Sequence, residues 1–413
     1  MHRKNPSDVP KRDKCRPIGL LSRSCYKVAA LFVYARMKAR ARVSVRDGLQ
    51  LRAWALALLG GQRPDASRLA ACSASTWRVF LATERCALAL KARMAGAAGD
   101  VPPLETAATR ELQRVLSARG QLLRIGQLAV AHRMAAIVLK GGVAALASAA
   151  PVDLHDVDVL VRPPDAERLA ALLDREGFHA TGPAGTAHLA QRIAPNAVQI
   201  EVHFAIADVD LSEATWSGAR PLDGAAGLSR LGAADHLWHL LVHSVVTHPH
   251  RRGSLRDVLL VAAGLGDCSA AELSQVERLI AGHPLSQPLG DVLAMARELR
   301  DGVPVRDRFR REAAANYVLR GPLGWLGFSR FWTVAFVRAL FSQLGSAVER
   351  RGEWATAWSR PDFVSPWEFV ARLEPRAPRL VRLCRTAVKV VRLMVCRVVV
   401  WPVAVAVRGL AAR

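Results

Sequence analysis

The sequence predicts an α+β fold, in which a small mixed β-sheet is flanked by helical N-terminal and C-terminal regions. The pattern from Leu49 to about Ala131 is helical, and helical patterns return from Ala233 onward. Between these regions, the stretches 156–161 and 198–206 alternate with the period of a β-strand. A sheet covered by helices is the natural packing for elements in this order.

Two further signals fall between the helical regions. The short apolar run from Ile137 to Leu139 reads as a strand that ends at a pair of glycines, and an alanine-rich helix follows it. After the stretch 156–161, Pro163-Pro164 opens a helix and Gly177 closes it. Proline at the start and glycine just past the end is the expected asymmetry of a helix.

Composition and these patterns divide the chain into five segments. We predict a basic arm at residues 1–47, a helical N-terminal region at 48–131, the sheet-bearing core at 132–228, a helical C-terminal domain at 229–360 and a basic amphipathic tail at 361–413.

The net charge of +23 is concentrated at the two ends of the chain. Residues 1–46 carry thirteen Lys and Arg against two Asp, and residues 376–413 carry nine against no acid. A protein that grips duplex nucleic acid spreads its positive charge over the body, so nucleic acid is not an expected partner. Basic ends instead fit an anionic membrane surface, or a polyanion such as RNA held by the tails.

The tail has a pattern of its own. Arg382, Arg385, Lys389 and Arg392 recur every three or four residues in a valine-rich stretch, which is typical of a basic amphipathic helix on an anionic membrane. A helix packed on the protein body fits the same pattern, and so does a strand, because valine has a weak helix propensity.

Cysteine usage and hydropathy indicate a cytoplasmic protein. The seven cysteines are scattered and form no C-x-x-C pair, which excludes zinc-ribbon and thioredoxin-like sites and fits reduced thiols. No stretch reaches the roughly 20 apolar residues of a membrane-spanning helix, and no secretory signal is evident.

Two carboxylates mark the candidate site. Asp156 and Asp158 lie two residues apart on a strand, so their side chains point to the same face with Cβ atoms roughly 7 Å apart. That spacing suits hard, oxygen-preferring cations, Mg²⁺ above all. Glu201, on the polar face of a later strand, brings a third carboxylate to the same rim. Three carboxylates suit a two-metal site, in which one ion activates an attacking hydroxyl and the other stabilises phosphate charge.

The glycine pair Gly141-Gly142 is the second part of the candidate site. Glycine at a strand-to-helix junction lets phosphate oxygens approach backbone N–H groups, assisted by the positive end of the following helix. Lys140 either adds a positive charge toward the phosphates or serves as a structural partner. His203 shares the strand face of Glu201 and is expected to support the carboxylates.

These motifs resemble the nucleotidyltransferase superfamily that includes DNA polymerase beta and the aminoglycoside nucleotidyltransferases, and more closely its branch of uncharacterised bacterial nucleotidyltransferases. Thirteen residues separate the glycine pair from the paired aspartates. The matching phrases, over roughly residues 50–300, are Leu139-Lys140-Gly141-Gly142, Asp156-Val157-Asp158-Val159-Leu160-Val161, Gly177-Phe178, Glu201-Val202-His203-Phe204, His239-Leu240-Leu241-Val242-His243 and Arg256-Asp257.

The resemblance implies a metal-dependent enzyme that moves a nucleoside monophosphate from a nucleoside triphosphate to an acceptor hydroxyl, with release of pyrophosphate. It assigns the metal ligands, two Mg²⁺ ions being expected, to Asp156, Asp158 and Glu201. The acceptor would be a sugar, another small molecule or a peptide. From the residues themselves, we expect Lys140, Gly141, Gly142 and His203 to bind the nucleotide.

The chain departs from the family pattern at two places. Its third acid is a glutamate where aspartate is usual, and Leu154-His155 precedes the aspartate pair where an arginine is common. The alternative is therefore a degenerate nucleotidyltransferase fold that serves as a nucleotide-binding or membrane-associated partner protein without catalysis.

A histidine series lies outside these motifs. His236, His239 and His243 are spaced to share one helical face, with His248 and His250 nearby. A zinc site is one interpretation. No cysteine or acidic partner lies at zinc-like spacing, so packed or nucleotide-facing histidines are the interpretation we favour.

Overall fold

The computed structural model describes residues 44–320, apart from 66–68, 70–71, 95–100, 148–151, 182–183, 185–186, 207–208 and 249–250. The predicted amphipathic tail and nearly all of the predicted basic arm lie outside the described residues. The predicted C-terminal domain is described up to residue 320.

A seven-stranded mixed sheet forms the centre of the fold, in the order β3-β4-β5-β2-β1-β7-β6. The pair at its middle, β2 and β5, is parallel, whereas β1 is antiparallel to β2 and parallel to β7. The predicted α+β class with helical flanks is thereby confirmed. The strands are β1 (Ala136–Val138), β2 (Asp156–Val161), β3 (His179–Thr181), β4 (Gln191–Ile193), β5 (Gln199–His203), β6 (Arg220–Pro221) and β7 (Leu228–Arg230).

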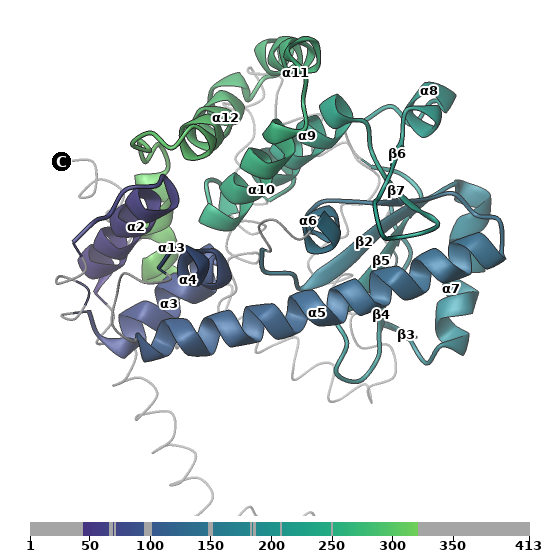
Figure 1. The fold of residues 1–413 in the computed structure, drawn as a ribbon, viewed down its shortest axis with the longest axis horizontal. Helices are drawn as coiled ribbons and strands as arrows, with labels where there is room; N and C mark the ends of the chain where they lie inside the picture. The colour runs from purple at the N-terminus through teal and green to yellow at the C-terminus, as the bar shows by residue number, and fades with distance from the viewer. Residues whose placement is uncertain are drawn as a thin grey trace, which may run out of the picture.

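The long helix α5 and helix α7 cover one face of this sheet. Leu122 and Ile125 of α5 are buried in the same apolar core as Val157 and Val159 of β2, and Figure 1 shows α5 running from the other N-terminal helices across the sheet. These helices are α2 (Val45–Leu59), α3 (Ala74–Glu84), α4 (Ala87–Met94), α5 (Pro102–Ala131) and α7 (Pro163–Arg175).

Helix α7 begins and ends as its sequence predicts. Prolines occupy its first positions, where their missing N–H groups cost no intrahelical hydrogen bond. Gly177 follows it with φ +87°, a left-handed conformation that glycine adopts without a Cβ clash. The N–H of Phe178 then bonds back to the carbonyl of Leu173, which ends the helix as a Schellman motif.

The opposite face of the sheet carries polar side chains of β2 and β5, among them Asp158 and His203, together with a small apolar cluster that includes Leu160. Helix α6 lies between the sheet and helix α10 (Figure 1). Among the described helices, none combines the length and apolar character needed to cross a membrane. The remaining helices are α6 (Gly141–Ala147), α8 (Glu213–Ser217), α9 (Ala233–Val242), the π-helical turn η2 (His243–Thr247), α10 (Leu255–Gly266), α11 (Ala270–Gly282), α12 (Ser286–Arg300) and α13 (Arg310–Arg320).

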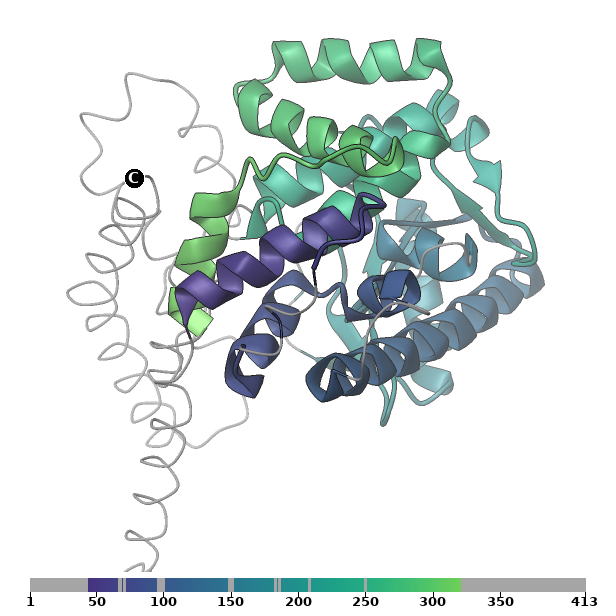
Figure 2. The ribbon, with the colours of Figure 1, turned by 60° about the vertical axis from the view of Figure 1, so that its left-hand side comes forward.

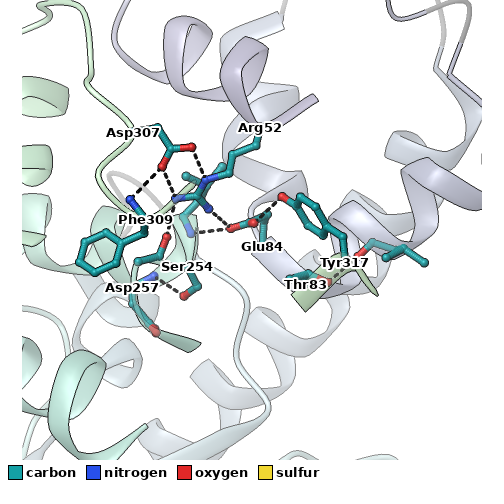
Figure 3. Close-up of polar contacts among 11 residues, drawn as sticks. Arg52, Thr83, Glu84, Ser254, Asp257, Asp307, Phe309 and Tyr317 are labelled. Atoms are coloured by element: carbon teal, nitrogen blue, oxygen red, sulfur yellow. Dashed lines mark hydrogen bonds and ion pairs between the residues drawn. The ribbon is translucent and has the colours of Figure 1, made fainter. Parts of the chain in front are cut away.

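A buried ion-pair network joins the N-terminal helices to the C-terminal part of the described chain. Helices α2 and α13 lie side by side in both views (Figures 1 and 2). Arg52 of α2 contacts Glu84 at the end of α3, at 2.8 Å, and Asp307 before α13, at 2.9 Å. The hydroxyl of Tyr317 donates a hydrogen bond to Glu84 at 2.6 Å (Figure 3). Since Arg52 and Glu84 are each only 1% exposed, the network replaces the hydration that both charges lose.

Candidate metal and nucleotide site

The candidate site lies on the polar face of the β2–β5 pair. Parallel pairing places Asp158 directly opposite Glu201. Because residues two apart on a strand point to the same face, Asp156 joins Asp158 on that face, and His203 joins Glu201. The sheet register therefore brings the predicted carboxylates to one surface.

Three of these side chains converge on one point. The Nε2 atom of His203 lies 2.9 Å from Oδ1 of Asp158 and 3.5 Å from Oε2 of Glu201. One ligand atom from each of the three residues lies within 4.8 Å of the others, and no other group of this kind occurs among the described residues. Asp156 is outside this group, although it lies on the same strand face.

Gln191 orients Glu201. Its side-chain amide, on the neighbouring strand β4, donates a hydrogen bond to Oε1 of Glu201, which leaves Oε2 facing His203. The extra methylene of glutamate thus carries its carboxylate to within reach of the same point as Asp158. Two carboxylates and one imidazole form a donor set that divalent cations such as Mn²⁺ and Zn²⁺ accept, and the carboxylates alone also suit Mg²⁺.

Lys140 is the cation beside Asp158. Its backbone takes the left-handed conformation, with φ +51°, at the point where the chain turns from β1 into α6. A non-glycine residue adopts this conformation only where the surrounding structure imposes it. The Nζ atom of Lys140 lies 2.8 Å from Oδ1 of Asp158, so Lys140 is a structural partner of Asp158 in this conformation.

The two aspartates differ in their electrostatics. Burial favours the neutral form of Asp158, but the charge of Lys140 and the hydrogen bond from His203 outweigh it and hold the pKa of Asp158 well below its usual range. Burial, followed by the negative charge of Asp158, raises the pKa of Asp156. Within the described chain, the carboxylate of Asp156 makes no hydrogen bond or ion pair. The pair is therefore incompletely neutralised, which fits a site for a divalent cation.

Gly141 and Gly142 are required by packing. A Cβ atom on Gly141 would lie 2.5 Å from Cδ2 of Leu154, and one on Gly142 would lie 2.6 Å from Cγ1 of Val138. Real Cβ atoms do not approach other heavy atoms so closely. The glycine pair thus lets α6 pack tightly against the residues around β1 and β2, and its predicted contact with phosphate stays a prediction.

The histidine series lines α9 and continues into η2. Both ring nitrogens of His239 are buried without a hydrogen-bond partner among the described residues. The rings of His239 and His243 are 6.1 Å apart, and those of His243 and His248 are 4.4 Å apart. Among the described residues, none of these histidines belongs to a group of side chains that could hold a metal ion. The burial of the histidines agrees with the interpretation as packed side chains. A π-helical turn is rare and frequently occurs at functional sites.

One buried residue beside the site was missed by sequence reasoning. The side chain of Asp153, three residues before Asp156, accepts hydrogen bonds from Arg114 at 2.6 Å and Arg85 at 2.7 Å, and pairs with His155 at 2.9 Å. Its carbonyl accepts one from Arg256 at 2.7 Å. Three of these partners lie 39 to 103 residues away, so no local pattern could have indicated them.

The buried histidines predict a loss of stability in acid. Burial lowers the pKa of His236 to about 4 and that of His239 to about 3. Both titrate near 6.5 in the unfolded chain. Unfolding therefore takes up protons below about pH 6.5, and the free energy of unfolding decreases as the pH is lowered. Glu111, whose pKa burial raises to about 7, acts in the opposite direction by one proton.

Comparing wild type with His236→Leu isolates one of these protons. The variant should lose up to about 1.4 kcal/mol per pH unit of the wild-type pH dependence between pH 6 and 5. Urea unfolding at a series of pH values measures the slope. Identical slopes for the two proteins would show that His236 is protonated in the folded state.

The fold and the site together define an α+β protein whose mixed sheet carries, on one face, three side chains that could hold a metal ion. A family model described as uncharacterised nucleotidyltransferase matches residues 90–301, just over half of the chain. The chain belongs to this nucleotidyltransferase family, as the motif resemblance predicted. The match begins within α4 and ends directly after α12, so it includes the whole sheet. A comparison with curated proteins found no match.

Proposed function

We propose that this protein transfers a nucleoside monophosphate from a nucleoside triphosphate to an acceptor hydroxyl, with release of pyrophosphate. The observation that carries the proposal is the convergence of Asp158, Glu201 and His203 on one point, with Asp156 on the same strand face. The family membership supports the same reaction class.

The residues present fit a divalent cation. Asp158, Glu201 and His203 would hold it, and the unpaired carboxylate of Asp156 offers a further ligand or a place for a second ion. When bound, the cation neutralises charge on the reacting phosphate and favours ionisation of the attacking hydroxyl. Mg²⁺ and Mn²⁺ both suit this donor set.

The chain's own residues would position the reacting groups and neutralise the charge of the phosphates. The acceptor hydroxyl gives up its proton to water, and its oxygen forms a bond to the α-phosphorus. The bond from that phosphorus to the bridging oxygen breaks, and pyrophosphate leaves with the bonding electrons. Asp158 is held ionised by Lys140 and His203. Lys140 is also close enough to this site to offer its charge to the phosphates when a cation takes its place beside Asp158. Catalysis of this kind rests on positioning and on charge neutralisation.

A second candidate function is nucleotide binding without catalysis. The contact of 2.8 Å between Lys140 and Asp158 favours it, because a lysine ammonium already supplies positive charge where a cation would bind. Such a protein would bind a nucleoside triphosphate equally well with and without metal.

A thermal-shift screen of the four nucleoside triphosphates, each with Mg²⁺, with Mn²⁺ and with EDTA, tests the proposal. A ligand at one hundred times its Kd stabilises the folded state by about 2.7 kcal/mol, so micromolar binding is readily detected. We expect stabilisation that requires the metal. Equal stabilisation in EDTA would favour binding without catalysis, and no stabilisation by any triphosphate would contradict both functions.

A further inference from the structure

A group of three arginines lies next to the candidate site, separate from the potential metal ligands Asp158, Glu201 and His203. It consists of Arg85, which follows α3, and of Arg251 and Arg256, which lie before and within α10. Arg85 and Arg256 meet at Asp153, through its carboxylate and its carbonyl, each at 2.7 Å. The group therefore has a fixed place, three residues before Asp156.

Positive charge exceeds negative charge around this group. Arg114 also contacts Asp153, so together with Arg114 the group has four guanidiniums. Against them stand the carboxylates of Asp153, Asp156 and Asp257, and Glu111, whose pKa burial raises to about 7. The like charges are felt: burial, and then Arg256 and Arg251, lower the pKa of Arg85 to about 10. Incompletely paired charge in a largely buried setting is costly, and a bound anion would relieve it.

Hydrogen-bonding capacity is also left over. The buried Nε atom of Arg251 has no hydrogen-bond partner among the described residues. Arg85 uses Nε and Nη2 on Asp153, whereas Arg256 uses Nε on Asp153 and Nη1 on Asp257. A guanidinium has five N–H donors, so each arginine retains donors for a ligand.

The arginine group adjoins both motifs of the candidate site. The Nη2 atom of Arg256 would lie 3.1 Å from a Cβ atom on Gly141, so it reaches the start of α6. Its charge also acts on Asp156. His243 is within electrostatic range of both Lys140 and Arg251. Positive groups therefore continue from the carboxylates at Asp158 to Arg251.

We propose that Arg85, Arg251 and Arg256 form a polyphosphate-binding site that holds the β- and γ-phosphates of the nucleoside triphosphate, and the pyrophosphate after transfer. Guanidiniums bind phosphate oxygens through paired N–H groups. The side chains of Arg85 and Arg256 are 12% and 6% exposed, which suits a short polyphosphate better than a polynucleotide backbone. The assignment rests on the proposed function for the identity of the ligand, but the anion site itself can be tested without metal.

Calorimetric titration of the full-length protein with inorganic tripolyphosphate in EDTA tests this site. Arg251→Gln should weaken tripolyphosphate binding by roughly tenfold or more, and its Nε gives up no native hydrogen bond. Arg119→Gln, at an exposed position of α5, makes the same change in net charge and should bind as wild type. Arg85→Lys, which keeps the charge but loses the fork geometry, should also bind more weakly.

Each result separates this inference from the proposed function. Undiminished binding in Arg251→Gln and Arg85→Lys, or no tripolyphosphate binding by wild type, would overturn the inference. Asp158→Asn should retain tripolyphosphate binding and lose the metal-dependent stabilisation by nucleotides. Tripolyphosphate binding without any metal-dependent nucleotide binding would sink the proposed function and leave the anion site standing.

Discussion

Asp158→Asn is expected to abolish metal-dependent nucleotide binding, with a rise in Kd of about a hundredfold or more. Asparagine keeps the shape of the side chain and removes the negative charge that Lys140 contacts at 2.8 Å and His203 at 2.9 Å. The same charge is one of the two carboxylates that converge on the candidate metal position. Equilibrium titration with a fluorescent triphosphate analogue, with and without Mn²⁺, measures the change.

Asp223→Asn is the matched control for this variant. Asp223 is exposed, in the turn between β6 and β7, and the substitution removes the same charge at a residue outside the metal-ligating group. It should bind nucleotide as wild type does. Because Asp158→Asn also leaves Lys140 and His203 without their charged partner, its thermal stability must be checked so that binding is compared on folded protein. Unchanged metal-dependent binding by a folded Asp158→Asn protein would rule out Asp158 as a ligand.

Arg52→Met is expected to lower the free energy of unfolding by about 3–5 kcal/mol. Arg52 donates hydrogen bonds to Glu84 and Asp307 (Figure 3). It also donates one to the carbonyl of Gly253, and its side chain is 1% exposed. Methionine fills much of the volume but leaves the buried charge of Glu84 without a cation. Urea unfolding of the two proteins at neutral pH gives the difference.

The surface pair of Arg124 and Glu176 provides the comparison for Arg52. The two side chains are 49% and 31% exposed, so the interaction is screened by solvent. Arg124→Met should therefore lower the free energy of unfolding far less than Arg52→Met does. Equal small losses in the two variants would mean that the Arg52 network contributes little to joining α2, α3 and α13.

Elements with a clear period were predictable. The alternation in 156–161 and the proline and glycine at the two ends of α7 are local signals, and β2 and α7 have the expected bounds within a residue or two. The observed strand β5 is shorter than the strand predicted at 198–206, because β5 ends at His203. There, the N–H groups of Phe204 and Ala205 both bond to the carbonyl of Ala187 instead of continuing the ladder.

Apart from β1, the short strands were not predictable, and neither was the order of the strands in the sheet. Strands β3, β4, β6 and β7 contain only two or three residues each, which is too few to show a period of two. The parallel pairing of β1 with β7 joins residues about ninety positions apart. The π-helical turn η2 was also missed, because a single extra residue per turn does not disturb an apolar pattern of this length.

In the candidate site too, the local features were predictable from the sequence and the tertiary contacts were not. The spacing of Asp156 and Asp158 indicated one face of a strand, and the alternation around Glu201 and His203 indicated another, because both patterns are local. That Asp158 lies opposite Glu201 depends on strand register, which no local pattern contains. The contacts of Gln191 with Glu201 and of Asp153 with its arginines likewise depend on the tertiary fold.

The measurement that tests the central claim most directly is a titration with Mn²⁺, followed by electron paramagnetic resonance of the free ion, in the presence of a nucleoside triphosphate. The claim is that Asp158, Glu201 and His203 hold the cation with which the nucleotide binds. Wild type should bind Mn²⁺ beyond the amount held by the nucleotide alone, and Asp158→Asn and His203→Ala should each remove that excess. Mn²⁺ binding that is the same in all three proteins would contradict the claim.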